Sequence, residues 1–545
     1  MIRARVLFLA ASLVTAWGGD LRLRPPMWTD ADDKPIPRPQ AQRVSELYAI
    51  LYNTWLRHLD AEYNAVGARD HGALTVNAWD EAPDSSWFTN RIGRQPLTFA
   101  EILRGLDARP PGPPPWTVTG VIDEGYTPKL NIRDSAGRRH VLKFDPSAPE
   151  RNSAAERIST LIFHAAGYNV PGNTITYFRT GDLRLGDQAK MSDAVGRERP
   201  MTPADLEAAV ARVKPLPDGR YRALASSFVP GDGVGKFTYS GTRKDDPNDL
   251  IPHELRRDLR GLYVIASWVN HADSGDKNTF DSYVGEEGKK FIRHYLMDFG
   301  STMGSGDFVN GPYRIGHEYI FDGAAMERTF LTLGIWRRPW EVEGRIGYAE
   351  VGYFQPEMFA PRKWKPNYPN LAFARMDDAD AYWGAKIVTA FTGQLIQQLA
   401  EAGEYSRPEV TAYLADTLKR RRDAIGSYWL DRITPLEDFV LQDGRLVFRD
   451  IAVERGYAGE DSREYRLQTG RAGAPTVFRG RSAQLPALKL PDHAAADRYG
   501  RTPLVALRIQ SKSRAGGWAL PVEVVLGRNR DSTQLEVLGW RHAAR

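Results

Sequence analysis

The sequence contains no cysteine, which excludes disulfide bonds, thiolate catalysis and zinc sites built on thiolates. Beyond the N-terminus it has no apolar run of the ~18–20 residues that a membrane-spanning helix needs, so we expect no transmembrane span in the mature chain. It also has no large excess of either charge. Lys and Arg number 73 against 68 Asp and Glu, a net charge of +5 over 545 residues, so we expect no nucleic-acid partner.

The N-terminus has the pattern of a secretory signal. Arg3 and Arg5 precede the apolar run 6–14, and the small residues Thr15 and Ala16 follow it. We therefore expect residues 1–19 to be a signal peptide cleaved near Ala16, with the mature protein exported to a periplasmic or extracellular location. An uncleaved anchor or a buried strand is the alternative interpretation.

A chain of this length exceeds one ordinary hydrophobic core, so several domains are expected. The proline-rich stretch 110–115 is typical of a stiff connector and ends an N-terminal helical and irregular segment. Together with changes in hydrophobic patterning along the chain, it predicts five parts: the signal peptide 1–19, the N-terminal segment 20–115, a first lobe at 116–235 with an insertion at 180–220, a second lobe at 236–435, and a C-terminal domain at 436–545. Residues 40–64, 380–403 and 407–430 show helical periodicity, whereas 436–545 show only strand patterns, which indicates a β-sandwich.

A lysine and a glutamate follow each other in a strand–helix pattern. Lys143 lies among apolar residues on the third strand after the connector, and Glu156 lies on the next predicted helix, 152–166. A lysine in such a strand is unusual unless it has a charged partner, so we expect an ion pair between the two side chains. An exposed lysine on a strand edge is the simpler alternative.

The polar loop 270–279 carries the strongest chemical signal. Asp273 and Asn278 are five residues apart, as in the kinase pattern H-R-D-x-x-x-x-N, and a predicted strand pair then ends at Asp298-Phe299-Gly300. An amide delivered before the first strand and a carboxylate delivered after the second can hold one Mg²⁺ between them. Asn278 and Asp298 are therefore the predicted metal ligands.

Two further features are candidate nucleotide contacts. Gly120 and Gly125 lie between the first two predicted strands and permit a tight hairpin over phosphates, although most such glycines serve ordinary turns. Phe228 ends a strand at 223–228 that looks like the hinge strand of kinases, and this resemblance implies a nucleotide contact for Phe228. These residues, with Lys143, are the predicted nucleotide-binding set.

The loop Ala272-Asp-Ser-Gly-Asp-Lys-Asn-Thr-Phe280 resembles the catalytic loop of HipA-like kinases, and it is similar to that of compact phosphatidylinositol 4-kinases. The stretch Asn152-Ser-Ala-Ala-Glu156, followed by Gly167-Tyr-Asn-Val-Pro171, resembles the HipA-like helix and turn. The resemblance covers about residues 116–300, and helices to ~430 would complete the second lobe. It does not extend to 1–110 or 436–545.

This resemblance implies an α+β fold with a bilobal protein-kinase-like core, followed here by the C-terminal all-β sandwich. It also implies Mg-ATP-dependent phosphoryl transfer to an unknown acceptor, which could be a protein, a lipid or a small molecule. Lys143 would contact the α- and β-phosphates, Glu156 would orient it, and Asp273 would position the acceptor hydroxyl. Asn278 and Asp298 would bind Mg²⁺.

The sequence departs from the kinase pattern in ways that leave alternatives open. A full G-x-G-x-x-G is missing, and Asp276 is a second loop carboxylate that could take the role of Asp273. His271, His294 and His317 lie near these carboxylates in the sequence, so a zinc hydrolase is another hypothesis. The same fold could also catalyse nucleotidyl transfer, or could serve as an exported pseudokinase that only binds a partner.

Overall fold

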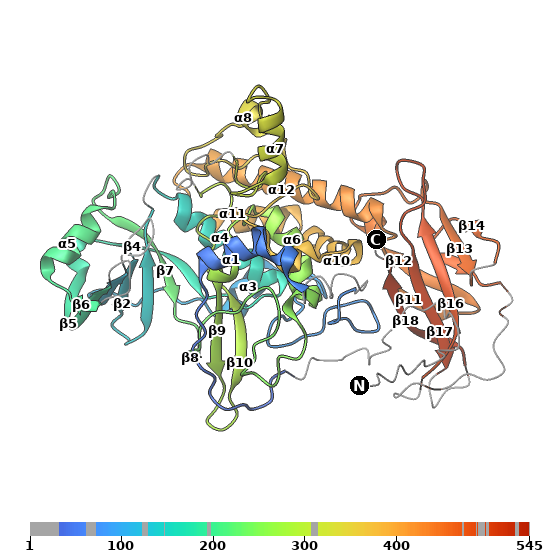
Figure 1. Ribbon diagram of the computed structural model, residues 1–545, viewed down its shortest axis with the longest axis horizontal. Helices are drawn as coiled ribbons and strands as arrows, with labels where there is room; N and C mark the ends of the chain where they lie inside the picture. Colours follow the sequence, from blue (N-terminus) through green and yellow to red (C-terminus); the bar gives the residue numbers. More distant parts are fainter. Residues whose placement is uncertain are drawn as a thin grey trace, which may run out of the picture.

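The computed structural model describes residues 32–61, 72–122, 129–145, 148–192, 198–306, 314–470, 473–486, 488, 496, 501–528 and 534–543. The fold is α+β, as predicted. A sheet built from β1–β7 lies at one end of the molecule, a mainly helical region occupies the middle, and the C-terminal strands form the other end (Figure 1). The predicted signal peptide and Gly125 lie outside the described residues.

The N-terminal segment runs across the middle of the molecule. It contains α1 (Glu46–Thr54), the short 3₁₀ helix η1 (Leu56–Leu59) and α3 (Phe99–Leu106). The helix expected over 40–64 is shorter because Ser45 caps α1, where its hydroxyl accepts a hydrogen bond from Tyr48 N at 3.3 Å. At the other end, Trp55 leaves helical geometry, with φ −128° and ψ −52°.

Seven strands form the first sheet in the order β4-β7-β3-β2-β1-β5-β6. Their bounds are β1 (Trp116–Ile122), β2 (Lys129–Arg133), β3 (Arg139–Lys143), β4 (Asn173–Phe178), β5 (Leu183–Ser192), β6 (Glu198–Pro200) and β7 (Tyr221–Ser227). Helix α4 (Arg151–Ala166) links β3 to β4. The predicted insertion 180–220 extends this sheet, because β5 pairs in parallel with β1, and it also carries α5 (Pro203–Ala211).

The middle region combines a small sheet with packed helices. Strands β8 (Asp232–Gly233), β9 (Thr279–Val284) and β10 (Phe291–Leu296) form the sheet. The helices are α6 (Arg257–Trp268), α9 (Leu371–Ala374), α10 (Asp378–Thr389), α11 (Gly393–Glu401) and α12 (Pro408–Arg432), with the 3₁₀ helices η2 (Thr180–Asp182), η3 (His253–Leu255) and η4 (Asp276–Asn278) elsewhere. The single helix expected over 380–403 is wrong: the chain breaks between α10 and α11, where Thr392 caps the new helix by accepting from Leu395 N at 3.1 Å.

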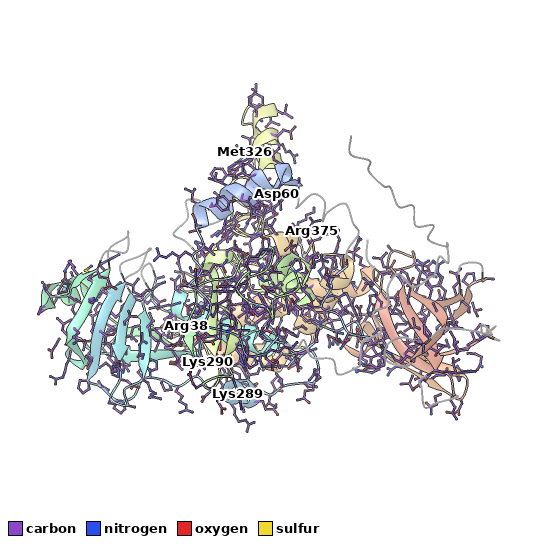
Figure 2. The ribbon with its side chains drawn as sticks, turned by 60° about the horizontal axis from the view of Figure 1, so that its bottom comes forward. Arg38, Asp60, Lys289, Lys290, Met326 and Arg375 are labelled. Atoms are coloured by element: carbon purple, nitrogen blue, oxygen red, sulfur yellow. The ribbon has the colours of Figure 1, made fainter. Side chains whose placement is uncertain are left out.

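Two short helices, α7 (Gly323–Leu331) and α8 (Pro339–Glu343), project from the middle region (Figure 1). Figure 2 shows Met326 on this projection, beside the segment that ends near Asp60. Trp55 and Phe321 pack together here, with ring centroids 5.2 Å apart.

The C-terminal region contains two antiparallel sheets that share one apolar core. The first has the order β11-β12-β15 and the second β14-β13-β16-β17-β18. Their bounds are β11 (Leu436–Gln442), β12 (Arg445–Asp450), β13 (Tyr465–Thr469), β14 (Thr476–Phe478), β15 (Ser482–Gln484), β16 (Thr502–Ser511), β17 (Val522–Arg528) and β18 (Glu536–His542), with α13 (Ile451–Glu454) after β12. Leu446 of the first sheet and Ile509 and Val524 of the second are fully buried in this core.

Within the described ranges, no helix has both the length and the apolar character needed to cross a membrane.

Candidate functional site

Strand register places two lysines side by side on the first sheet. Lys129 on β2 is the direct cross-strand partner of Lys143 on β3. Like charges at such positions repel each other unless an anion lies between them. The anions come from outside the sheet: Glu156 in the second turn of α4, and Asp298 after β10.

These four side chains form a continuous charged cluster. Lys143 Nζ lies 2.6 Å from Glu156 Oε1 and 3.4 Å from Asp298 Oδ1. Lys129 Nζ lies 3.4 Å from the other carboxylate oxygen, Asp298 Oδ2. The expected ion pair between Lys143 and Glu156 is therefore present, and it faces Asp298.

Burial differs sharply within this cluster. The side chain of Glu156 is 3% exposed, whereas that of Asp298 keeps 42% of its surface exposed. Glu156 is thus an internal support for Lys143. Asp298 is open to an incoming group.

Mutual electrostatics set the protonation of the cluster. The positive charge of Lys143 holds the pKa of Asp298 well below its usual range, against the effect of burial, and Lys129 adds to this shift. Burial acts to lower the pKa of Lys143, but the charges of Asp298 and Glu156 outweigh it and raise that pKa. Burial raises the pKa of Glu156, although Lys143 opposes the change. Lys143 and Asp298 are consequently charged near neutral pH.

The backbone around Asp298 is held in an unusual conformation. Asp298 has φ 57°, in the left-handed region that side chains with a Cβ rarely adopt. The next residue, Phe299, anchors this turn: its ring stacks on Phe163 of α4 at 4.7 Å and lies 5.3 Å from His271. Burial lowers the pKa of His271 to about 4, so this ring is a neutral packing element near pH 7.

The hairpin of β9 and β10 brings the two predicted metal ligands to one end. Leu296 pairs with Thr279, and beyond this pair Met297 N donates to Asn278 O at 2.9 Å. Asn278 therefore lies immediately before β9. Asp298 follows Met297, the residue that bonds to the Asn278 backbone, so both predicted ligands lie at the same end of the hairpin.

Asp273 is fixed by three neighbours. Asn278 Nδ2 donates to its backbone oxygen at 2.7 Å and to its Oδ2 at 2.9 Å. Lys277 Nζ and Asn367 Nδ2 each lie 3.3 Å from its Oδ1. Burial raises the pKa of Asp273, although Lys277 and Asn278 oppose this, and Asp298 is close enough to add to the increase. The five-residue spacing between Asp273 and Asn278 thus corresponds to direct contact.

Asp276 faces a different environment. Its Oδ1 accepts a hydrogen bond from Tyr239 N at 3.0 Å, and burial raises its pKa to about 6. Among the described residues it contacts neither Asp273 nor Asp298, so its role is to brace the loop.

The donor set at the end of the hairpin fits Mg²⁺. Asn278 uses its amide nitrogen to hold Asp273, and none of the described residues donates a hydrogen bond to its Oδ1. This leaves an amide oxygen and the Asp298 carboxylate, which are the oxygen ligands that Mg²⁺ uses together with waters and phosphates. Within the described ranges, no three His, Asp or Glu side chains gather as an all-protein metal site would require. His294, for example, pairs with Asp281 at 2.7 Å and stacks on Trp87.

The predicted nucleotide contacts Gly120 and Phe228 lie outside the charged cluster that contains Lys143. Gly120 sits at a register shift in β1, where an added Cβ would lie 2.7 Å from Lys190 O, so close approach of β5 explains this glycine. Phe228 follows β7 and is 43% exposed, with the Arg139 guanidinium 3.9 Å from its ring centroid. Neither residue belongs to the contacts that join the charged cluster, and their role in binding stays a prediction.

Sequence reasoning missed three charged residues at the site. Lys129 reaches Asp298, as described above. Lys236 Nζ donates to Lys277 O at 2.5 Å, and no described carboxylate lies within ion-pair distance of it. Glu46 of α1 reaches Lys277 Nζ at 2.6 Å, so the N-terminal segment contacts the loop. Of these three residues, only Lys129 could have been predicted from the sequence, because β2 and β3 flank a short turn and therefore pair in a defined register.

No family model, no curated protein and no solved structure matches this chain.

Proposed function

We propose that this protein is an atypical kinase that binds Mg-ATP beside Asp298 and transfers a phosphoryl group to an acceptor hydroxyl. One observation carries the proposal: Lys143, supported by the buried Glu156, points at Asp298, while Asp273 and Asn278 contact each other on the adjoining loop. Phosphoryl transfer depends on positioning and charge stabilisation, and these are the side chains that such chemistry uses.

The lysines would hold the phosphates. Lys143 and Lys129 converge on Asp298 at 3.4 Å each, distances long enough for both ammonium groups to turn toward a bound anion. Burial lowers the pKa of Lys236, which has no described carboxylate partner and is therefore suited to a phosphate oxygen. Three cations from three separate segments would thus surround the triphosphate.

Asn278 Oδ1 and the Asp298 carboxylate would hold Mg²⁺, which when bound neutralises charge on the phosphate oxygens. The two lysines that now face Asp298 keep its carboxylate ionised and ready for that role.

Asp273 would position the acceptor. Its carboxylate is oriented by Asn278, Lys277 and Asn367, so a hydroxyl that donates to it would be aligned for attack. Asp276 lacks this arrangement, which favours Asp273 for the role.

The remaining architecture fits the same proposal. The lysine on a third strand and the glutamate on the following helix support a kinase-like first lobe, and α6 with α10–α12 would form the second. The shared core of the two C-terminal sheets supports a β-sandwich. The N-terminal pattern supports action outside the cytoplasm.

Incubation of the protein with γ-labelled ATP, Mg²⁺ and a lysate of the native host, followed by mass spectrometry, tests the proposal. We expect label in a product, and a loss of turnover of ~100-fold or more in Asp273→Ala with nucleotide affinity kept within a few-fold. Asp276→Ala is the matched control and should lose less. Mg-ATP binding without any transfer would favour a pseudokinase. Release of the label as pyrophosphate, together with a product that carries the mass of a nucleotide, would favour nucleotidyl transfer. Equal activity of the two variants would contradict the role of Asp273.

A further inference from the structure

The projection built from α7 and α8 carries an apolar, uncharged turn. Residues 329–336, which we call the apolar turn, contain no charged side chain, whereas Arg328 precedes them and Arg337 and Arg338 follow. Single exposed apolar side chains are ordinary on a protein surface, but a contiguous group of them marks an interaction site. Four large apolar residues of the turn are 71–87% exposed: Phe330, Leu331, Leu333 and Ile335.

Leu333 has neither a packing reason nor a backbone reason to be apolar. It is 87% exposed, so its side chain has almost no partner within the protein. Its φ of 50° lies in the left-handed region, which favours Gly, Asn and Asp over a leucine. Stability alone would therefore place a small polar residue here. Leucine at this position indicates a contact with an apolar partner outside the chain.

The N–H groups of the apolar turn are satisfied internally. From Thr332 to Trp336 every backbone N–H donates to a nearby oxygen: four to backbone carbonyls at 2.9–3.1 Å, and that of Trp336 to Thr332 Oγ1 at 3.3 Å. The hydroxyls of Thr329 and Thr332 also donate to carbonyls of α7, at 2.8 Å each. Because an unsatisfied donor is costly in hydrocarbon, this arrangement lets the turn enter the apolar part of a lipid leaflet.

A tryptophan and two arginines form a cluster where the turn meets α8. Trp336 is partly exposed, and the guanidinium carbons of Arg328 and Arg338 lie 4.5 and 5.4 Å from its ring centroid. Arg338 also pairs with Glu318 at 3.0 Å. Tryptophan rings and arginine side chains favour the headgroup region of a bilayer, between hydrocarbon and water. The chain thus places these residue types beside its exposed apolar group.

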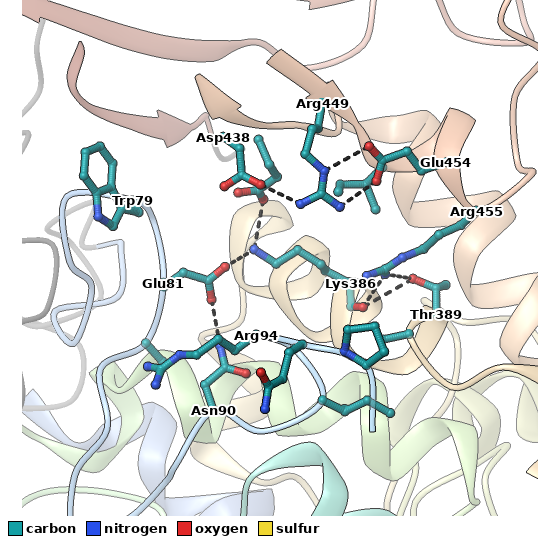
Figure 3. A pocket seen from close by; sticks show the side chains of 18 of the residues that line it. Trp79, Glu81, Asn90, Arg94, Lys386, Thr389, Asp438, Arg449, Glu454 and Arg455 are labelled. Atoms are coloured by element: carbon teal, nitrogen blue, oxygen red, sulfur yellow. Dashed lines mark hydrogen bonds and ion pairs between the residues drawn. The ribbon is translucent and has the colours of Figure 1, made fainter. Parts of the chain in front are cut away.

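Two arginines that border the turn have no carboxylate partner among the described residues, namely Arg328 and Arg337. Cations elsewhere are paired. In the cavity between α10 and the first C-terminal sheet (Figure 3), for example, Lys386 contacts Glu81 directly and lies 2.9 Å from Glu437 Oε1. The two arginines are therefore available to anionic lipid phosphates. Exposed glutamates of α7 and α8 offset part of this charge, so apolar insertion should supply most of the binding.

We propose that the apolar turn inserts into one leaflet of a lipid bilayer that contains anionic headgroups, with Arg328 and Arg337 at the phosphates. A protein partner could supply hydrogen bonds to an open turn, whereas hydrocarbon cannot, so the satisfied N–H groups favour a bilayer over a protein. The binding is peripheral, since none of the described helices can span a membrane. It does not depend on the proposed kinase activity.

Vesicle sedimentation of the full chain tests the proposal, with vesicles of phosphatidylcholine alone and with ~30% phosphatidylglycerol added. We expect the wild type to bind the anionic vesicles, and the neutral vesicles more weakly. Leu333→Asn leaves the charge unchanged and suits the left-handed backbone, so it should fold normally and lose at least tenfold in vesicle affinity. Leu250→Asn is the matched control, because Leu250 is 79% exposed on the segment before η3, outside the projection; its vesicle affinity should not change.

A second variant tests the role of the arginines. Arg337→Gln should weaken binding to the anionic vesicles about fivefold and leave binding to the neutral vesicles unchanged; an unchanged affinity for both would contradict the preference for anionic lipid. Absence of wild-type binding to both vesicles, or equal affinity of Leu333→Asn and the wild type, would overturn the proposal. A dimer that Leu333→Asn dissociates, without any vesicle binding, would assign the turn to a second copy of the chain and would also overturn it.

Discussion

Substitution of Lys143 by methionine removes the cation that joins Glu156 to Asp298. The Glu156 side chain, 3% exposed, would then be a buried carboxylate whose one remaining hydrogen bond among the described residues comes from Asn173 Nδ2, at 3.4 Å. Removal of one partner from a buried pair costs about 3–5 kcal/mol, because the remaining charge is left uncompensated. Lys143 itself is 18% exposed, so we expect a loss near the lower end, ~3 kcal/mol.

A second substitution separates the unpaired charge from the loss of packing. Glu156→Gln in the Lys143→Met background removes the stranded carboxylate, so the double variant should regain ~1–2 kcal/mol over the single one. Urea unfolding followed by tryptophan fluorescence measures both changes. Lys190→Met is the control, because Lys190 forms an exposed pair with Glu198 at 2.8 Å and should show no measurable change. If Glu156→Gln destabilises Lys143→Met further, the buried-pair reasoning is wrong.

Three further outcomes are expected. Asp276 has a folded pKa of about 6 against an ordinary 3.8, so the stability that its protonated form provides is lost as pH rises from ~4 to ~6. In urea unfolding, this group should lower the free energy of unfolding of the wild type by up to ~3 kcal/mol over that range, and Asp276→Asn should lack this decrease. Lys129→Met should weaken Mg-ATP binding about tenfold by calorimetry, whereas Arg133→Gln on the same strand should not; equal effects would argue against a phosphate contact. Gly120→Ala should destabilise the protein by ~1–3 kcal/mol in thermal unfolding, because the new Cβ would meet Lys190 O; an unchanged melting temperature would contradict the tight β1–β5 contact.

The parts of the site that the sequence predicts are those coded by short motifs. Lys143 and Glu156 follow each other on a strand and the next helix, and Asp273 and Asn278 share one loop. Contacts of this kind depend on local geometry, so spacing alone was enough to expect them. Asp298 could also be predicted as part of the site, because the antiparallel hairpin of β9 and β10 brings the chain back to the end where Asn278 lies.

The missed parts depend on tertiary packing. Glu46 reaches Lys277 across 231 positions, since α1 folds back on the loop, and nothing in either segment specifies that partner. The network of Glu81, Lys386 and Glu437 likewise joins three distant segments. The expected helix over 380–403 failed because apolar periodicity continues through Thr392, where a side-chain cap interrupts the backbone.

The central claim is that Asp298 binds Mg²⁺ with ATP, and a calorimetric titration of Mg-ATP into wild type and Asp298→Asn tests it most directly. Asp276→Asn is the matched control, because it makes the same chemical change on a nearby carboxylate that does not contact the cluster. We predict that wild type and Asp276→Asn bind Mg-ATP with similar affinity, and that Asp298→Asn loses magnesium-dependent binding. Unchanged magnesium-dependent binding in Asp298→Asn, or no binding by the wild type, would contradict the account.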